Sequence, residues 1–206
     1  ATGESQTIQI RVSVMKPYIY AQDADGNATS SETVAYAQIS VGEDYVLALK
    51  ANGTVWAWGR NDRGQLGLGT PADKLNVNVT YPTSVAYRTT ADEPAVAAIS
   101  AGANHALALL ADGTVLAWGH NDKGQLGNGI EGEMSLTPEV VNFDFASAYA
   151  DEADQRYIIQ IAAGRDHAMA LDNMGVVWVW GSNEYGQLGL SLEPDPITGE
   201  NNIFHT

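Results

Sequence analysis

The chain has 206 residues and no Cys, and its 25 Asp and Glu against 10 Lys and Arg give a formal charge of −15. With 45% apolar and 17% charged residues it can bury a core, which excludes a chain that is disordered throughout. The missing Cys exclude disulfide frameworks, cysteine zinc sites and thiol catalysis. Because the chain is acidic and its basic residues are scattered, we expect no nucleic-acid partner and no membrane insertion.

Residues 1–36 are interpreted as a leader. The alternation in Thr7–Met15 predicts a strand, which is either the end of a preceding domain or a strand that closes this one. Asp23–Asn27 is similar to part of a calcium loop, but the sixth and twelfth loop positions hold Ala28 and Val34. A hairpin turn at this place is therefore favoured over a calcium site, and metal binding there is left open.

Residues 37–190 contain three copies of one pattern, at about 37–94, 95–157 and 158–190. The first copy reads ISVGEDYVLALKANGTVWAWGRNDRGQLGLG from Ile39, and similar sequences start at Ile99 and Ile161. Three copies at a period of about 60 residues predict a repeat architecture in which neighbouring units stack.

Each copy predicts a tight β-hairpin. In the second copy His105–Leu109 alternates large and small side chains, Asp112-Gly113 forms a two-residue turn, and Thr114–Trp118 forms the next strand. The third copy has Met174-Gly175 in the turn, where only Gly has the turn preference, so a less ideal turn is expected there. A leading strand near Ile99 and connector strands complete four strands, the size of a propeller blade. The connector strands are expected at Pro82–Tyr87 and Pro138–Phe143.

Residues 191–206 are interpreted as a connector toward a missing next blade. Since a closed propeller needs at least four blades, three alternatives remain. The chain is a fragment of a longer propeller, or it closes by self-association with a second copy, or the leader and this tail build an atypical fourth blade.

Five spaced sub-motifs recur in all three copies: apolar-Ser-x-Gly, His-x-Leu-Ala-Leu, Asp-Gly-Thr-Val, Trp-Gly-x-Asn and Gly-Gln-Leu-Gly, with individual departures such as Tyr45 in place of the His and Leu116 in place of a Trp. This combination resembles the repeat of the regulator of chromosome condensation family. The resemblance implies an all-β fold, a β-propeller with three recognisable blades that is part of a longer propeller of about seven.

The shared residues are interpreted as structural. The three Trp-Gly pairs offer indoles for packing between blades and glycines for a sharp exit from the strand. The Gln of each Gly-Gln-Leu-Gly is expected to satisfy buried backbone groups, and the Leu to fill the core. His105 and His167 lie in different copies without a third partner at ligand spacing, so a hydrogen-bonding structural role is favoured over metal binding.

Catalytic patterns are missing from the sequence, which has no Gly-Lys-Ser/Thr phosphate loop, no His-Glu-x-x-His and no Gly-x-Ser-x-Gly. We therefore expect no enzyme, no catalytic residue, no cofactor and no metal centre.

The loops between Trp-Gly and Gly-Gln keep one Asn and vary around it. Because they occupy equivalent places in successive blades, they are expected to lie along one face, where loops on a rigid scaffold commonly carry recognition. The candidate binding residues are Arg60, Asp62, Arg63, His120, Asp122, Lys123, Ser182, Glu184 and Tyr185.

The sequence favours a non-enzymatic module for protein–protein interaction or scaffolding, with an unidentified protein partner. Acidity, the missing Cys and the β-rich leader favour a bacterial secreted or cell-surface protein, and the cytoplasm is left open. The alternative is the nuclear role that the resemblance implies, guanine-nucleotide exchange or chromatin association. That role calls for basic DNA-contacting segments, which this sequence lacks.

Overall fold

The computed structural model describes residues 21–22, 28–29, 36–69, 75, 78–87, 93–145 and 156–189. The strand expected at 7–15, the segment 23–27 and the connector at 191–206 lie outside this part of the chain. The chain divides into two units, residues 1–35 and 36–206. In the first unit β1 (Ala21–Gln22) pairs antiparallel with β2 (Ala28–Thr29).

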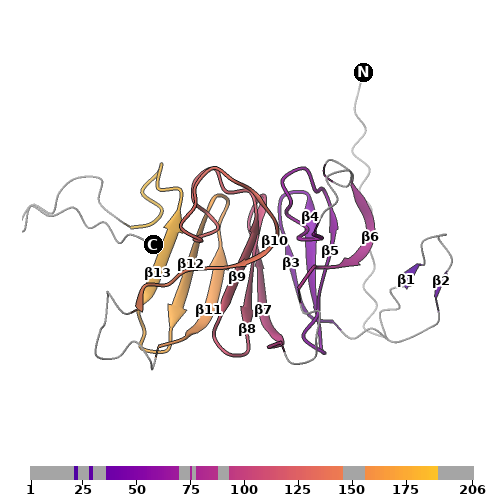
Figure 1. Ribbon diagram of the computed structural model, residues 1–206, viewed down its shortest axis with the longest axis horizontal. Helices are drawn as coiled ribbons and strands as arrows, with labels where there is room; N and C mark the ends of the chain where they lie inside the picture. The colour runs from indigo at the N-terminus through magenta and orange to yellow at the C-terminus, as the bar shows by residue number, and fades with distance from the viewer. Residues whose placement is uncertain are drawn as a thin grey trace, which may run out of the picture. The chain divides into compact units, whose positions relative to one another are not determined.

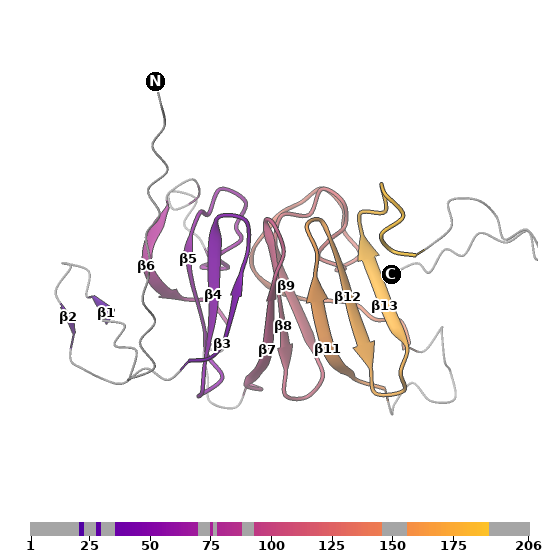
Figure 2. The same cartoon turned by 180° about the vertical axis from the view of Figure 1, so that it is seen from behind.

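The second unit contains three antiparallel sheets, here called the first, second and third blades (Figures 1 and 2). The first blade has the order β3 (Tyr36–Val41), β4 (Tyr45–Lys50), β5 (Val55–Gly59) and β6 (Val79–Ser84). The second has β7 (Val96–Ala101), β8 (His105–Leu110), β9 (Val115–Gly119) and β10 (Ser135–Val140). The described part of the third has β11 (Ile158–Ala163), β12 (His167–Asp172) and β13 (Val177–Gly181). None of the described residues forms a helix long and apolar enough to span a membrane.

The connector strands begin three residues earlier than predicted. β6 starts at Val79, opposite Gly59, and β10 starts at Ser135, opposite Gly119. The prediction placed Pro82 and Pro138 at the strand starts, but both lie inside their strands. Proline is tolerated there because β6 and β10 are the outermost strands of their sheets, where one side of the backbone needs no ladder hydrogen bond.

The expectation of a less ideal third hairpin turn is wrong. Gly175 has φ 85°, close to the 79° and 89° of the glycines in the first two turns. Asp172 Oδ1 accepts hydrogen bonds from the backbone N–H groups of Met174 (3.0 Å) and Val176 (2.9 Å). In the first two turns the Asn52 and Asp112 side chains do this for the residue two positions on. The third turn is therefore stabilised from the end of its own strand.

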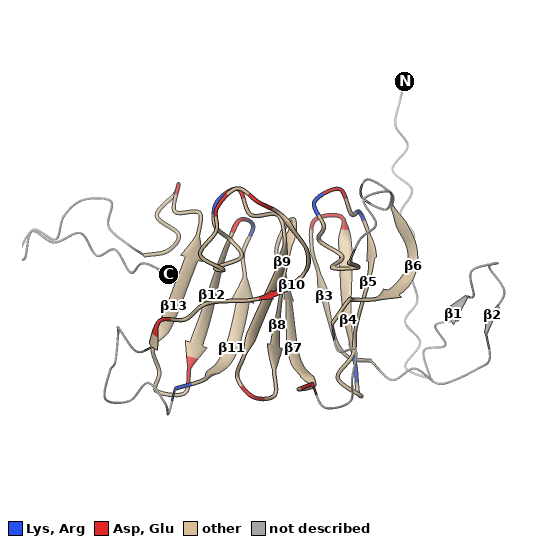
Figure 3. Cartoon of the chain, viewed as in Figure 1, with Lys and Arg blue, Asp and Glu red and all other residues tan. Residues whose placement is uncertain are grey.

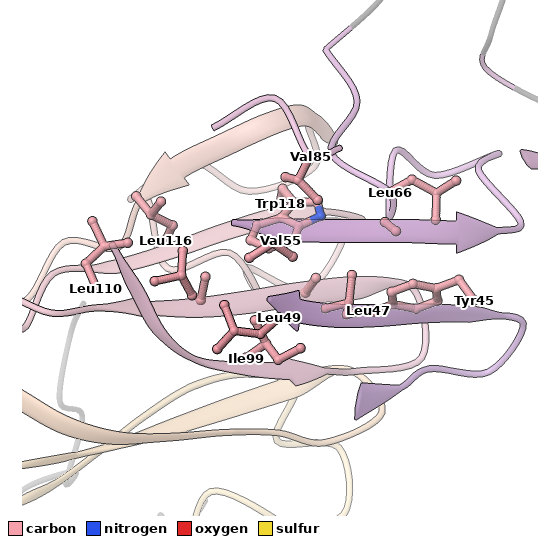
Figure 4. Packing of buried hydrophobic residues seen from close by; sticks show 14 residues of the cluster. Tyr45, Leu47, Leu49, Val55, Leu66, Val85, Ile99, Leu110, Leu116 and Trp118 are labelled. Atoms are coloured by element: carbon pink, nitrogen blue, oxygen red, sulfur yellow. The ribbon is translucent and has the colours of Figure 1, made fainter. Parts of the chain in front are cut away.

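Successive blades pack face to face, and alternate residues of each strand serve the two faces. In β8, Ala106, Ala108 and Leu110 belong to the core shared with the first blade, whereas Leu107 and Leu109 belong to the core shared with the third. The side of a blade that meets the preceding blade is here called its front face, and the side that meets the following blade its back face. Figure 4 shows the first of these cores, between the back face of the first blade and the front face of the second.

Trp118 is the largest side chain in that core and is fully buried. Trp180 takes the equivalent place between the second and third blades, with 2% of its surface exposed. The indole nitrogens donate hydrogen bonds of 3.0 Å to the carbonyl oxygens of Gln65 and Gln125 in the preceding blade. The interpretation of these tryptophans as packing residues is therefore confirmed.

Candidate functional site

The loops that follow the third strand of each blade share one internal framework. The buried Asn61 and Asn121 and the equivalent Asn183 accept a hydrogen bond at Oδ1 from the backbone N–H five residues on, at 3.0–3.1 Å. Gln65, Gln125 and Gln187 accept at Oε1 from the backbone N–H two residues earlier, each at 2.8 Å. The role predicted for the glutamines, satisfying backbone groups inside a tight loop, is confirmed.

These loops lie at one end of the sheets, opposite the hairpin turns. Tyr45 pairs with Gly59 at the end where the first loop leaves the sheet, and Leu49 pairs with Val55 at the other end. The first loop reaches the next blade, since Gln65 Nε2 donates to Asn104 Oδ1, in the turn between β7 and β8, at 3.4 Å. The loops at residues 60–63, 120–123 and 182–185 together are here called the loop edge, and charged residues are spread along it (Figure 3).

In the first blade the loop edge is held by an ion-pair network. Arg60 contacts Asp62 at 2.6 Å and Asp44 at 3.3 Å. Hydrogen bonds and charge from Asp62, reinforced by Asp44, raise the pKa of Arg60. Partial burial acts to raise the pKa of Asp62, but hydrogen bonds from Arg60 and Gln65 outweigh it and the pKa is lowered. Asp62 is thus a carboxylate at neutral pH.

The other two loops present different side chains on the same framework. In the second, His120 Nδ1 lies 3.3 Å from Asp122, and Lys123 is exposed. In the third, Ser182 is half-buried and Glu184 is exposed, and Tyr185 has 86% of its surface exposed. All nine predicted residues therefore lie on the loop edge, and their binding role stays a prediction.

Each loop carries a carboxylate at the same position of the framework. The three are Asp62, Asp122 and Glu184, directly after the constant Asn. Since the framework repeats, the sequence places one carboxylate in each loop in the order of the blades, which is here called a row, and Asp62 and Asp122 also accept a hydrogen bond from the Gln of their own loop.

The hydrogen-bonding role predicted for His105 is wrong. Its side chain is fully buried, and neither ring nitrogen has a hydrogen-bond partner among the described residues. The ring instead lies against Gly102, where a Cβ would collide with it. Burial lowers the pKa of His105 to about 4, helped by the nearby His167 and His120, so the ring is neutral at pH 7. Tyr45, which stands at the equivalent place, donates its hydroxyl to the carbonyl oxygen of His105.

Sequence reasoning missed one buried ion pair. Arg156 Nη1 lies 2.6 Å from Asp172 Oδ2, with side-chain exposures of 4% and 0%. Trp178 Nε1 also donates to Asp172, at 3.2 Å. Burial acts to raise the pKa of Asp172, but hydrogen bonds from Val176, Trp178 and Arg156 outweigh it and the pKa is lowered. A carboxylate where the second copy has Leu110 was the signal available in the sequence.

The described residues contain no group of three or more His, Cys, Asp or Glu placed to hold a metal ion. A depression of about 330 Å³ at the loop-edge end of the first strands is lined by backbone and small residues, together with Glu43 and Arg165. It offers no pair of groups suited to acid–base or nucleophilic chemistry.

Known protein families and proteins were found to be similar to this chain over its repeats. A family model described as "Regulator of chromosome condensation (RCC1) repeat" matches residues 52–109, 112–171 and 174–202. A second model of the same description matches 36–65, 96–125 and 158–187. Among curated proteins, the probable E3 ubiquitin-protein ligase HERC6 of Homo sapiens is 34% identical over 166 residues, which are 81% of this chain and 15% of that protein. The protein RCC2 homolog of Danio rerio is 33% identical over 147 residues, covering 69% of this chain and 25% of that protein.

Solved structures show the same fold. Human WBSCR16 superposes with a TM-score of 0.63 and 26% identity over 76% of this chain and 37% of that one. Prp20p of Saccharomyces cerevisiae gives 0.60 and 28% over 76% of this chain and 34% of that one. The predicted all-β, propeller-type fold is thereby confirmed. The chain spans well under half the length of each of these proteins.

Proposed function

This chain belongs to the regulator of chromosome condensation (RCC1) repeat family, and from that membership we propose that it is a non-catalytic module that binds a basic protein through the loop edge. The observation that carries the proposal is that Asp62, Asp122 and Glu184 occupy the same place in three loops that share the Asn and Gln hydrogen bonds to the backbone. Rigid loops with constant interiors and variable exposed residues are suited to recognition rather than to chemistry.

The net charge of the whole chain, rather than that of the loop edge, which also carries Arg60, Arg63 and Lys123, supports a basic partner. The chain has a formal charge of −15, and complementary charge raises the rate of encounter and selects partners. Prp20p, which resembles this chain in fold, has been described together with its binding to Gsp1p and histones. Histones are basic proteins, so they serve as a probe of the right chemistry. The bacterial secreted or cell-surface location expected from composition stays a prediction, and the relatives described above are eukaryotic.

Binding of purified core histones to the 206-residue chain tests this proposal. The triple variant Asp62→Asn, Asp122→Asn, Glu184→Gln keeps the size of each side chain and removes the row of charge, together with the ion pair between Arg60 and Asp62, so its fold is first checked by circular dichroism. We expect it to weaken binding by about tenfold at about 0.15 M salt, since charge pairs at an interface are partly screened. Equal binding by the triple variant, or no binding by the parent chain, would contradict the proposal.

A matched pair of single variants locates the effect. Asp122 lies on the loop edge, whereas Asp112 is exposed in a hairpin turn at the other end of the same sheet. Asp112→Asn reproduces the Asn52-Gly53 turn of the first blade, so its fold is preserved. Asp122→Asn should weaken binding and Asp112→Asn should not. Equal losses would show that overall charge, and not the loop edge, attracts the partner.

A second candidate function is nucleotide exchange on a small GTPase, the activity that membership of the repeat family suggests. Release of a fluorescent guanine nucleotide from a purified small GTPase measures it directly. Acceleration by this chain would establish that activity and replace the first proposal as the main function. An unchanged release rate would reject it.

A further inference from the structure

The two interfaces between neighbouring blades repeat the same contacts. In both, an indole from the front face of one blade donates to the Gln carbonyl of the loop before it, at 3.0 Å. In both, that indole covers a loop glycine, Gly67 or Gly127, so that a Cβ there would lie under 3.0 Å from the ring. The backbone is also shared, because Glu43 N–H donates to Ala103 O and Ala103 N–H donates to Arg165 O. One face of the repeat unit is therefore complementary to the other.

The first blade presents a front face of the same kind. Ile39 and Trp58 occupy the places of Ile99 and Trp118, which are buried between the first two blades. Ile39 has 68% of its surface exposed, against 3% for Ile99. Trp58 is half-buried, whereas Trp118 is fully buried. The front face of the first blade thus has the side chains of an interface between blades, but these side chains are not buried.

The third blade presents the matching back face. Met169, Leu171 and Val177 continue the series of buried apolar residues on the back faces of the first two blades, and they line a groove of about 210 Å³. Val177 has 56% of its surface exposed, against 1% for the equivalent Val115. No described atom lies within 4 Å of the place where a Cβ of Gly189 would stand, although the equivalent glycines are covered by an indole.

We infer that a second copy of this chain docks head to tail, with the front face of its first blade on the back face of the third blade. Trp58 of one copy inserts over Gly189 of the other and donates its indole N–H to the carbonyl oxygen of Gln187. The contact is heterologous, since it joins two different faces. It continues an interface that the chain already forms twice within itself.

The front face of the first blade carries a charged residue, Lys50. Lys50 stands where Leu110 and Asp172 stand in the two existing interfaces, and its ammonium lies 3.5 Å from the centre of the Trp56 ring. Asp172 is fully buried at this position with an ion-pair partner. A charged residue is thus accommodated in an interface of this geometry, and Lys50 does not prevent docking.

The mass of the 206-residue chain in solution tests the inference. Sedimentation equilibrium should show association that increases with protein concentration. It should also increase as salt is raised, because each copy carries a charge of −15 and salt screens the repulsion. A monomer at every concentration would overturn the inference.

Two face variants separate this contact from other modes of association. Ile39→Asp disrupts the front face and Val177→Asp the back face, and both side chains are exposed, so folding is unaffected. Each variant alone should be monomeric. A mixture should form a one-to-one dimer that does not extend, because only one intact front face and one intact back face remain to meet. Association of either variant alone, or a mixture that stays monomeric, would overturn the head-to-tail arrangement.

The hydrogen bond is tested by Trp58→Phe, which should weaken association about tenfold by leaving the Gln187 carbonyl without a donor. Tyr185→Phe is the matched control, because it also removes one polar group from an aromatic side chain but lies on the loop edge. Equal effects of the two variants would contradict the proposed place of Trp58.

Discussion

The indole nitrogen of Trp118 donates a hydrogen bond of 3.0 Å to the carbonyl oxygen of Gln65, which lies 53 residues earlier in the preceding blade. This bond ties the loop that contains Gln65 to the hydrophobic core between the first and second blades, where Trp118 is buried. Trp180 and Gln125 repeat it one blade later. A substitution in the core between two blades is therefore expected to alter the conformation of the loop that is bonded to it, and a substitution in the loop to alter the packing of the core.

Trp118→Phe should lower the free energy of unfolding by about 2 kcal/mol, because it leaves a buried carbonyl without a donor and removes part of a fully buried ring. Urea unfolding followed by circular dichroism measures the change. Trp56→Phe is the control, since Trp56 is half-buried and its indole nitrogen donates to Thr54 Oγ1 of its own hairpin at 3.3 Å, not to another blade. A loss at Trp56 as large as that at Trp118 would contradict this role.

Acid should weaken the fold through His105. The folded pKa is about 4 and the ordinary value is 6.5, so between these pH values the unfolded chain binds a proton that the folded chain does not. The free energy of unfolding therefore falls as the pH falls through this window, by about 3 kcal/mol in total from this group.

His105→Tyr isolates that contribution, because Tyr45 already occupies the equivalent place in the first blade. We expect the variant to keep its stability at pH 7 and to lose less of it by pH 4 than the parent chain does. Urea unfolding at a series of pH values gives the comparison. Parallel pH profiles for the two proteins would show that His105 does not carry the effect.

Asp172→Asn should lower the free energy of unfolding by about 3 kcal/mol, because it leaves the Arg156 guanidinium buried beside a neutral group. The matched control is Asp166→Asn, whose ion pair with Arg165 spans 3.3 Å and is open to solvent, with side-chain exposures of 34% for Asp166 and 74% for Arg165. That change should alter stability by less than about 0.5 kcal/mol. Thermal and urea unfolding of both variants test the contrast, and similar losses would rule it out.

Gly102→Ala should be strongly destabilising for a steric reason. A Cβ at Gly102 would overlap the ring of His105 and would lie 2.7 Å from the carbonyl oxygen of Gly164. A loss of about 3 kcal/mol is expected from such overpacking. Gly129→Ala serves as the control, since no described atom lies within 4 Å and only its φ of 79° is unfavourable, at a cost of about 1 kcal/mol. If the control lost more stability than Gly102→Ala, steric contact would not be the cause.

The hairpins were predictable from the sequence because their chemistry is local. Alternating side chains fix the strands, and a glycine with φ near 80° fixes each turn, so both signals lie within a few neighbouring residues. The predicted connector strands begin three residues late because Pro82 and Pro138 favour a strand start over a strand interior. Only their position on the outer edge of a sheet, which is a tertiary property, makes proline acceptable inside them.

The loop edge was predictable by comparing the copies, since equivalent loops in stacked blades must lie at the same end. The state of His105 was not, because it depends on the burial that the next blade provides, more than 50 residues away. The partner of Asp172 was also hidden. Arg156 comes from the connector before β11, and no local pattern links the two residues.

Because the front and back faces are complementary, the evolution of such a chain is constrained at the faces of its repeats. A duplicated repeat already carries a front face and a back face that fit its neighbours. Adding a repeat to the array therefore requires no new interface. In contrast, a substitution on either face must suit a neighbour that carries its own version of the opposite face. Tyr45, at the place of His105 and His167, is an example of such a fit, because its hydroxyl donates to the carbonyl oxygen of His105 in the adjoining blade. In this architecture the number of repeats can therefore change readily, whereas the residues on the two faces of each repeat are constrained by the neighbouring repeats.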